Sequence, residues 1–130
     1  MVPMTSSDAL SPGDPVGQTS VTVAVERREG GAVVLRVAGE IDLITAPQLE
    51  ESITQALREQ PKLLVVDLTG VGFLASAGMS VLVAAHNRTG ERTQLRVVAT
   101  GSATFRPMEL TGLSEVLSIY PALGDALDDA

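Results

Sequence analysis

A serine stands inside a long segment that carries almost no charge. Ser76 lies between Ala75 and Ala77, and Asp67 is the only charged residue from 63 to 87. The apolar spacing of a helix begins at Ser76, where a serine ordinarily caps the helix and contributes about 1 kcal/mol. The functional alternative is phosphorylation, because the free N–H groups and the positive dipole end of a helix N-terminus stabilise a phosphate. The small neighbours of Ser76 leave room for a kinase to approach.

Apart from Ser76, few residues in the chain are candidates for catalysis or metal binding. His86 is the only histidine and shares the apolar face of its expected helix, so the sequence presents no Ser–His–acid set. Asp42 and Asp67 each accompany an expected strand and could form paired carboxylates, although surface or capping roles explain them more simply. The chain has no metal-ligand spacing and no Gly-rich phosphate loop. We therefore expect no metal, no cofactor and no enzyme activity.

Composition excludes several kinds of partner. The net charge of −7 argues against nucleic acid and against an anionic membrane surface, and it favours a basic protein patch as the partner. The chain has no cysteine, so disulfides, thiolate metal sites and thiol-based redox control are excluded. No targeting segment is visible and no apolar run approaches about 18 residues, so we expect a cytoplasmic protein. We also expect a monomer.

The 130 residues divide into a tail and one domain. Residues 1–19 are rich in Ser, Pro, Gly and Thr, which predicts a disordered tail. Alternation from Val21 to Val25 predicts a strand, and a second strand over 33–37 follows the turn residues Gly30-Gly31. Residues 20–130 therefore begin with a hairpin.

A helix is predicted after this hairpin. Thr45 is its expected N-cap, with Gln48 completing a capping box. Pro47 fits the first turn, and the apolar stripe runs to a predicted end near Gln60.

The next segment leads to the serine. The apolar run Leu63–Leu68 predicts a central buried strand, and Gly70 and Gly72 mark its exit. Residues 71–75 are then expected to form a surface connection, with its apolar side chains either tucked under or offered to a partner.

The rest of the chain alternates helices and strands, which predicts parallel crossovers. The expected elements are a helix from Ser76 to a Gly90 cap, a strand over 95–99, a shorter helix from Gly101 or Ser102 to Leu110, a strand over 116–120, and a helix with Pro121 at its first position. The fold class is α/β, with a mixed four- to five-stranded sheet and about four helices.

Three segments resemble the signatures of a known family. Gly39–Ala46 is similar to the segment after the second strand of STAS domains, and Val66–Met79 is similar to the segment around their phosphorylated residue. Thr111–Leu113 matches a recurring turn near the family's end. The resemblance covers about residues 20–127, implies a single STAS domain, and is strongest to actinobacterial members.

A free-standing STAS domain of this length resembles the bacterial anti-sigma factor antagonists. In that family the unphosphorylated antagonist binds an anti-sigma factor that is also a serine kinase, and binding frees the sigma factor. ATP-dependent phosphorylation makes the antagonist let go, and a phosphatase restores it. By position, Ser76 matches the phosphoacceptor and Asp42 matches an acidic residue that meets basic side chains of the kinase. The implied partner-binding residues are Asp42, Thr45, Phe73, Leu74, Ala75, Ser76, Ala77, Gly78 and Met79.

This chain departs from the family pattern beside the serine. Many members have Asp immediately before the phosphoacceptor, where this chain has Ala75, and Ala77 replaces a common Ser or Thr. The missing charge favours a second hypothesis, a STAS scaffold or transporter accessory that is never phosphorylated at Ser76. A third hypothesis is a small-ligand or nucleotide-binding domain with its ligand at the same helix N-terminus.

Overall fold

The computed structural model describes residues 20–128, so the tail predicted for residues 1–19 lies outside the described residues. The strands are β1 (Val21–Arg28), β2 (Ala32–Ile41), β3 (Leu63–Leu74), β4 (Gln94–Val98) and β5 (Ser118–Tyr120). The helices are α1 (Ala46–Arg58), α2 (Ser76–Thr89), α3 (Phe105–Leu110) and α4 (Leu123–Leu127), with a short 3-10 helix η1 (Leu113–Glu115) before β5.

The five strands form one mixed sheet in the order β1-β2-β3-β4-β5. β1 and β2 pair antiparallel, and the turn between them contains Gly30 and Gly31, both with φ +83°, a conformation that glycine adopts freely. The other neighbouring pairs are parallel, as helical crossovers require. The predicted opening hairpin, mixed sheet and four helices are confirmed.

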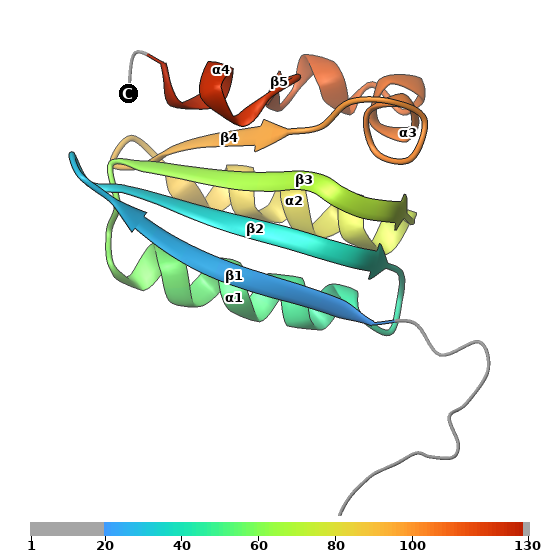
Figure 1. The fold of residues 1–130 in the computed structure, drawn as a ribbon, viewed down its shortest axis with the longest axis horizontal. Helices are drawn as coiled ribbons and strands as arrows, with labels where there is room; N and C mark the ends of the chain where they lie inside the picture. The colour runs from blue at the N-terminus through green and yellow to red at the C-terminus, as the bar shows by residue number, and fades with distance from the viewer. Residues whose placement is uncertain (1–19, 129–130) are drawn as a thin grey trace, which may run out of the picture.

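The two faces of the sheet bury separate apolar clusters. On one face, α1 and α2 pack against the sheet, and Leu49, Ile53 and Leu82 from these helices are fully buried. The other face holds a smaller cluster around Val34 and Val65 that α4 covers. Figure 1 shows α1 and α2 behind the sheet and α4 along its β4–β5 edge. The sheet is therefore covered by helices on both faces.

β3 is longer than the sequence predicts and ends at Leu74 rather than Leu68. Gly70 does not end the strand but lies at a shift in register against β2. A Cβ at Gly70 would lie 3.0 Å from the carbonyl oxygen of Val37, so this glycine allows the close approach of a β-bulge. The predicted surface connection over 71–75 is therefore wrong, because pairing with β2 continues almost to the start of α2.

The last elements are shorter than predicted. Residues 101–104 form turns, so α3 begins at Phe105. Val116 and Leu117, predicted to begin the last strand, instead form the turn and bend that follow η1, which leaves β5 only three residues from Ser118. Pro121 precedes the α4 N-cap, Ala122, instead of occupying the first helical position.

Candidate functional site

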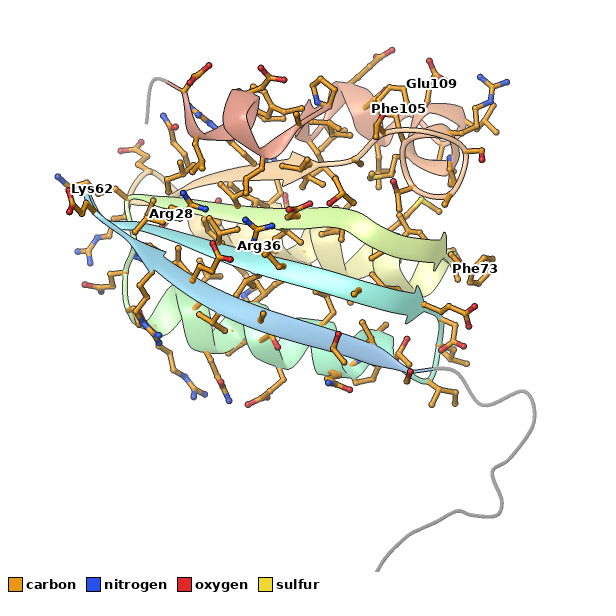
Figure 2. The ribbon with its side chains drawn as sticks, in the orientation of Figure 1. Arg28, Arg36, Lys62, Phe73, Phe105 and Glu109 are labelled. Carbon is orange, nitrogen blue, oxygen red and sulfur yellow. The ribbon has the colours of Figure 1, made fainter. Side chains whose placement is uncertain are left out.

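The ends of β2 and β3 bring the predicted site residues together. The N–H of Ala75 donates to the carbonyl of Ile41 over 2.8 Å, which ties the end of β3 to the end of β2. The β2–α1 loop (residues 42–45) therefore lies beside the first turn of α2. Figure 2 shows Phe73 at this edge, pointing away from the sheet. We call the region formed by residues 42–45, Phe73 and Ser76 the serine pole.

Ser76 is exposed and occupies the first helical position of α2. The N-cap is Ala75, which has extended dihedrals (φ −86°, ψ 170°) and no side-chain cap. Within residues 20–128, the Ser76 hydroxyl has no hydrogen-bond partner. The capping role that an ordinary serine plays at a helix start is therefore absent, and the hydroxyl is open to solvent.

The first turn of α2 keeps unused donors. The N–H groups of Gly78 and Met79 both donate to the carbonyl of Ala75, over 3.0 and 3.2 Å. The N–H groups of Ser76 and Ala77 find no backbone acceptor in the described part of the chain. The start of α2 therefore carries the partial positive charge of the helix dipole and two N–H groups without a backbone acceptor.

Gly78 lets α2 approach the strand ends. A Cβ on Gly78 would lie 2.5 Å from Cγ2 of Ile41 and 2.7 Å from Cδ1 of Leu74. Real Cβ contacts are essentially never this short, and both neighbours are buried in the core. The position of Ser76 is therefore set by close packing one half-turn further along the helix.

Asp42 organises the β2–α1 loop. Its Oδ1 accepts hydrogen bonds from the N–H of Ile44 over 2.9 Å and from the N–H of Thr45 over 3.0 Å. The Thr45 hydroxyl accepts from the N–H of Asp42 over 2.9 Å and donates to the carbonyl of Glu40 over 2.7 Å. Asp42 is only half-buried, so the same carboxylate shapes the loop and remains accessible from outside.

The capping box predicted for Thr45 and Gln48 does not form. Thr45 already has near-helical dihedrals (φ −94°, ψ −17°) and makes no side-chain cap. Its hydroxyl instead bonds the N–H of Asp42 and the carbonyl of Glu40 within the loop. The Gln48 side-chain amide donates to the carbonyl of Val21 over 3.1 Å. The prediction is wrong because the loop, rather than the helix, engages the Thr45 hydroxyl.

Two exposed apolar residues of this region were not identified from the sequence. Leu43 and Ile44 are 76% and 78% exposed, and Phe73 nearby in the fold is 51% exposed. The signal was present, since two large apolar residues stand side by side in a connection between a strand and a helix. Together the three side chains give the serine pole an apolar surface suited to a protein partner.

A groove extends the serine pole along α2. It has a volume of about 420 Å³ and runs from Ser76 past Met79 and Val83 to Thr111 and Leu113 beyond α3. The Thr111 hydroxyl lies 3.7 Å from the Met79 sulfur, so the turn after α3 closes one side. A partner that reaches Ser76 therefore has an apolar channel beside it.

Burial divides the residues predicted to bind a partner into two groups. The exposed or half-buried ones are Asp42, Phe73, Ala75, Ser76 and Ala77. The buried ones are Thr45, Leu74, Gly78 and Met79. The first group is accessible from outside the domain, and the second is packed within it.

Asp67 lies elsewhere and does not pair with Asp42. It sits in the middle of β3 opposite Arg36, which is about 17 Å from the end of β2 at 3.3 Å per strand residue. Its buried Oδ1 accepts from the N–H and the hydroxyl of Thr69, over 2.9 and 2.8 Å, and its Oδ2 lies 3.9 Å from Arg36. Asp67 therefore has a structural role within the sheet, where it interacts with side chains and backbone of β2 and β3.

Two further features concern residues 20–128 only. No group of three or more His, Cys, Asp or Glu side chains in this range is arranged to hold a metal ion. None of the helices in the same range has both the length and the apolar character needed to cross a bilayer.

Comparison with known proteins gives consistent matches. The family model described as STAS domain matches residues 23–126. The anti-sigma-F factor antagonist RsfB of Mycobacterium tuberculosis is 44% identical over 108 residues, covering 83% of this chain and 88% of that protein. The anti-sigma-B factor antagonist of Listeria monocytogenes is 30% identical over 107 residues, covering 82% and 94%.

A solved structure supports the same relationship. The crystal structure of an anti-sigma factor antagonist from Mycobacterium paratuberculosis matches this fold with a TM-score of 0.79 at 45% identity, covering 82% of this chain and 91% of that chain. The sheet order, the position of α2 and the family match over most of the chain lead to one conclusion. This chain belongs to the STAS domain family.

Proposed function

We propose that this protein is an anti-sigma factor antagonist. In its unphosphorylated state it binds an anti-sigma factor with serine kinase activity and so releases a sigma factor. ATP-dependent phosphorylation of Ser76 ends the binding, and a phosphoserine phosphatase restores it. The names of the relatives in Mycobacterium and Listeria support the antagonist role. This partner switching regulates transcription, which takes place in the cytoplasm.

The observation that carries the proposal is the free hydroxyl of Ser76. It is exposed, it caps nothing, and it has no hydrogen-bond partner within residues 20–128. A serine without a structural role, next to small residues at an accessible helix start, suits a kinase substrate. The unused N–H groups of the first turn then stabilise the phosphate on the free protein.

The surface around Ser76 suits a basic partner with apolar contacts. Leu43, Ile44 and Phe73 supply the apolar area, and the Asp42 carboxylate supplies negative charge. Arg106, the cation of α3, is already paired with Glu109 over 3.0 Å. Complementary charge of this kind steers association and fixes the register of a complex.

Phosphorylation changes this surface from apolar to strongly charged. A phosphoserine adds about −1.5 to −2 charges, which must be desolvated or repelled in the complex. A coupling of about 3 kcal/mol weakens binding roughly 150-fold, which is enough to release a partner. Ala75 adds no second carboxylate beside the phosphate, so in this chain the added charge comes from the phosphate alone.

A labelling experiment tests the proposal. The protein is incubated with candidate anti-sigma kinases from its host and labelled ATP, and the label is mapped by mass spectrometry. Label is expected on Ser76, absent in Ser76→Ala and retained in Ser80→Ala, a matched exposed serine one turn further along α2. Tight binding of a kinase without any label would contradict the switch and favour the scaffold hypothesis.

A further inference from the structure

A second cavity lies at the opposite end of the sheet from Ser76. Its walls come from the β1–β2 turn, the start of β3 and the start of β4, and its volume is about 500 Å³. The N–H of Lys62 donates to the carbonyl of Gly31 over 2.8 Å, and the N–H of Gln94 donates to the carbonyl of Lys62 over 2.9 Å. These bonds hold the three walls in fixed relative positions. We call the region formed by residues 28–31, Lys62 and Arg92 the hairpin pole.

Three cations line this cavity in a protein of net charge −7. Arg28 is paired with Glu26 over 3.0 Å. Lys62 and Arg92 make no hydrogen bond or ion pair through their charged groups with any residue from 20 to 128. Figure 2 shows Arg28 and Lys62 at the hairpin end of the sheet, far from Phe73.

The stem of Lys62 is held in place although its ammonium group is free. A Cβ added to Gly31 would lie 3.3 Å from Cγ of Lys62, so the stem lies over the turn. Gly31 has φ +83° and no side chain, which leaves this room for the stem. Lys62 is exposed and lines the cavity, and its aliphatic stem packs over the turn.

The cavity also has an apolar floor. Ala32 and Leu63 are buried beneath it, and the half-buried Leu127 from α4 closes one side. Glu29 and Glu91 line the cavity together with the cations. These two carboxylates disfavour an extended polyanion such as nucleic acid, whereas a compact anion can contact the cations alone.

We propose that the hairpin pole binds a small organic phosphate whose apolar body rests on the floor of Ala32, Leu63 and Leu127. The phosphate pairs with Lys62 and Arg92, and charge-assisted bonds to a guanidinium are the strong ones for this group. The volume is within the range of small-molecule sites. β3 spans the distance between the two poles, roughly 36 Å at 3.3 Å per residue, so the ligand does not touch the serine pole.

Titration with phenyl phosphate, followed by amide NMR of the full chain, tests this site. Phenyl phosphate is expected to shift the amides of Gly30, Gly31, Lys62 and Gln94 and to bind at least about tenfold more tightly than inorganic phosphate or phenol. The double variant Lys62→Gln/Arg92→Gln is expected to weaken binding at least about tenfold. The matched control Arg58→Gln/Arg106→Gln removes two charges outside the cavity and is expected to bind normally.

Three results would overturn the site. Equal affinity of the cavity variant and the control for phenyl phosphate would mean that binding depends only on the net charge of the protein. If inorganic phosphate binds as tightly as phenyl phosphate, the apolar floor contributes nothing to binding. If phenol binds as tightly, the cations contribute nothing. Shifts confined to α2 place the ligand elsewhere. If the double variant does not fold, the single variant Arg92→Glu, which changes one exposed side chain, takes its place. Its affinity for phenyl phosphate is then compared with that of the control.

Discussion

Around Ser76 the accessible side chains of the serine pole are apolar or acidic, whereas the hairpin pole places three cations around a cavity. The first is organised by the backbone and by buried neighbours, since Asp42 accepts two loop N–H groups and Gly78 lets α2 pack against Ile41. The second is organised by a glycine turn beneath a long side chain. Substitutions at the serine pole should therefore disturb the local structure as well as partner recognition, whereas substitutions of Lys62 and Arg92 at the hairpin pole should change mainly the charge of the cavity.

The largest effect on stability is expected for Gly78→Val, in the first turn of α2 beside the serine pole. The new side chain would clash with Ile41 and Leu74, and overpacking of this kind costs about 1–3 kcal/mol. Thermal unfolding should show a fall in Tm of roughly 5 °C per kcal/mol. The matched control is Gly72→Ala, where an added Cβ meets nothing within 4 Å. Equal stability of the two variants would show that α2 is not held by this contact.

Phe73→Ala should weaken partner binding without affecting the fold. An exposed aromatic residue at the centre of an interface contributes about 2 kcal/mol, which is roughly 30-fold in affinity. Val25→Ala truncates another exposed apolar residue, on β1, and is the control. Calorimetric titration against the anti-sigma kinase measures both. If Val25→Ala weakens binding as much as Phe73→Ala, the partner does not dock at the serine pole.

Two variants of Asp42 separate its structural role from its charge. Asp42→Ala removes the acceptor for the N–H groups of Ile44 and Thr45 and should cost about 1 kcal/mol of unfolding free energy. Asp42→Asn keeps an acceptor, so it should retain more of that stability while losing affinity for a basic partner. Chemical denaturation and titration provide the two readouts. An Asn variant that binds like the wild type would exclude a charge role.

The smallest effect concerns the ion pairs near the hairpin pole. A hydrogen bond from Arg36 lowers the pKa of Glu26, and a hydrogen bond from Arg27 lowers the pKa of Glu59. A lowered carboxyl pKa stabilises the fold above the unfolded pKa, and this contribution is lost as pH falls through the folded pKa. Stability should therefore decline slightly below about pH 5. Glu26→Gln/Glu59→Gln should flatten that decline, and an unchanged slope would contradict it.

The sequence predicts the fold well where the pattern is local. The turn at Gly30-Gly31, the buried run Leu63–Leu68 and the alternating order of later elements are visible in residue types alone. The end of β3 is not, because Gly70 suggests a strand exit when read locally. Its actual role is to allow a bulge against Val37, a contact between residues distant in sequence.

In the candidate site, too, local sequence patterns predict some features and tertiary contacts determine the others. Ser76 and Asp42 are identifiable because their segments resemble family signatures. The roles of their neighbours depend on tertiary contacts, since Thr45 turns its hydroxyl into the loop and Gly78 packs against two strands. The cavity at the hairpin pole is lined by Arg28, Lys62 and Arg92, which come from three separate segments, so no local sequence pattern predicts it.

The central claim is that phosphorylation of Ser76 controls partner binding, and affinity measurements test it most directly. The anti-sigma kinase is titrated with unmodified protein, with Ser76→Ala and with protein phosphorylated at Ser76, at one ionic strength. We expect similar affinities for the first two and an affinity roughly 150-fold lower for the phosphorylated form, corresponding to a coupling of about 3 kcal/mol. Equal affinity of all three forms would contradict the switch.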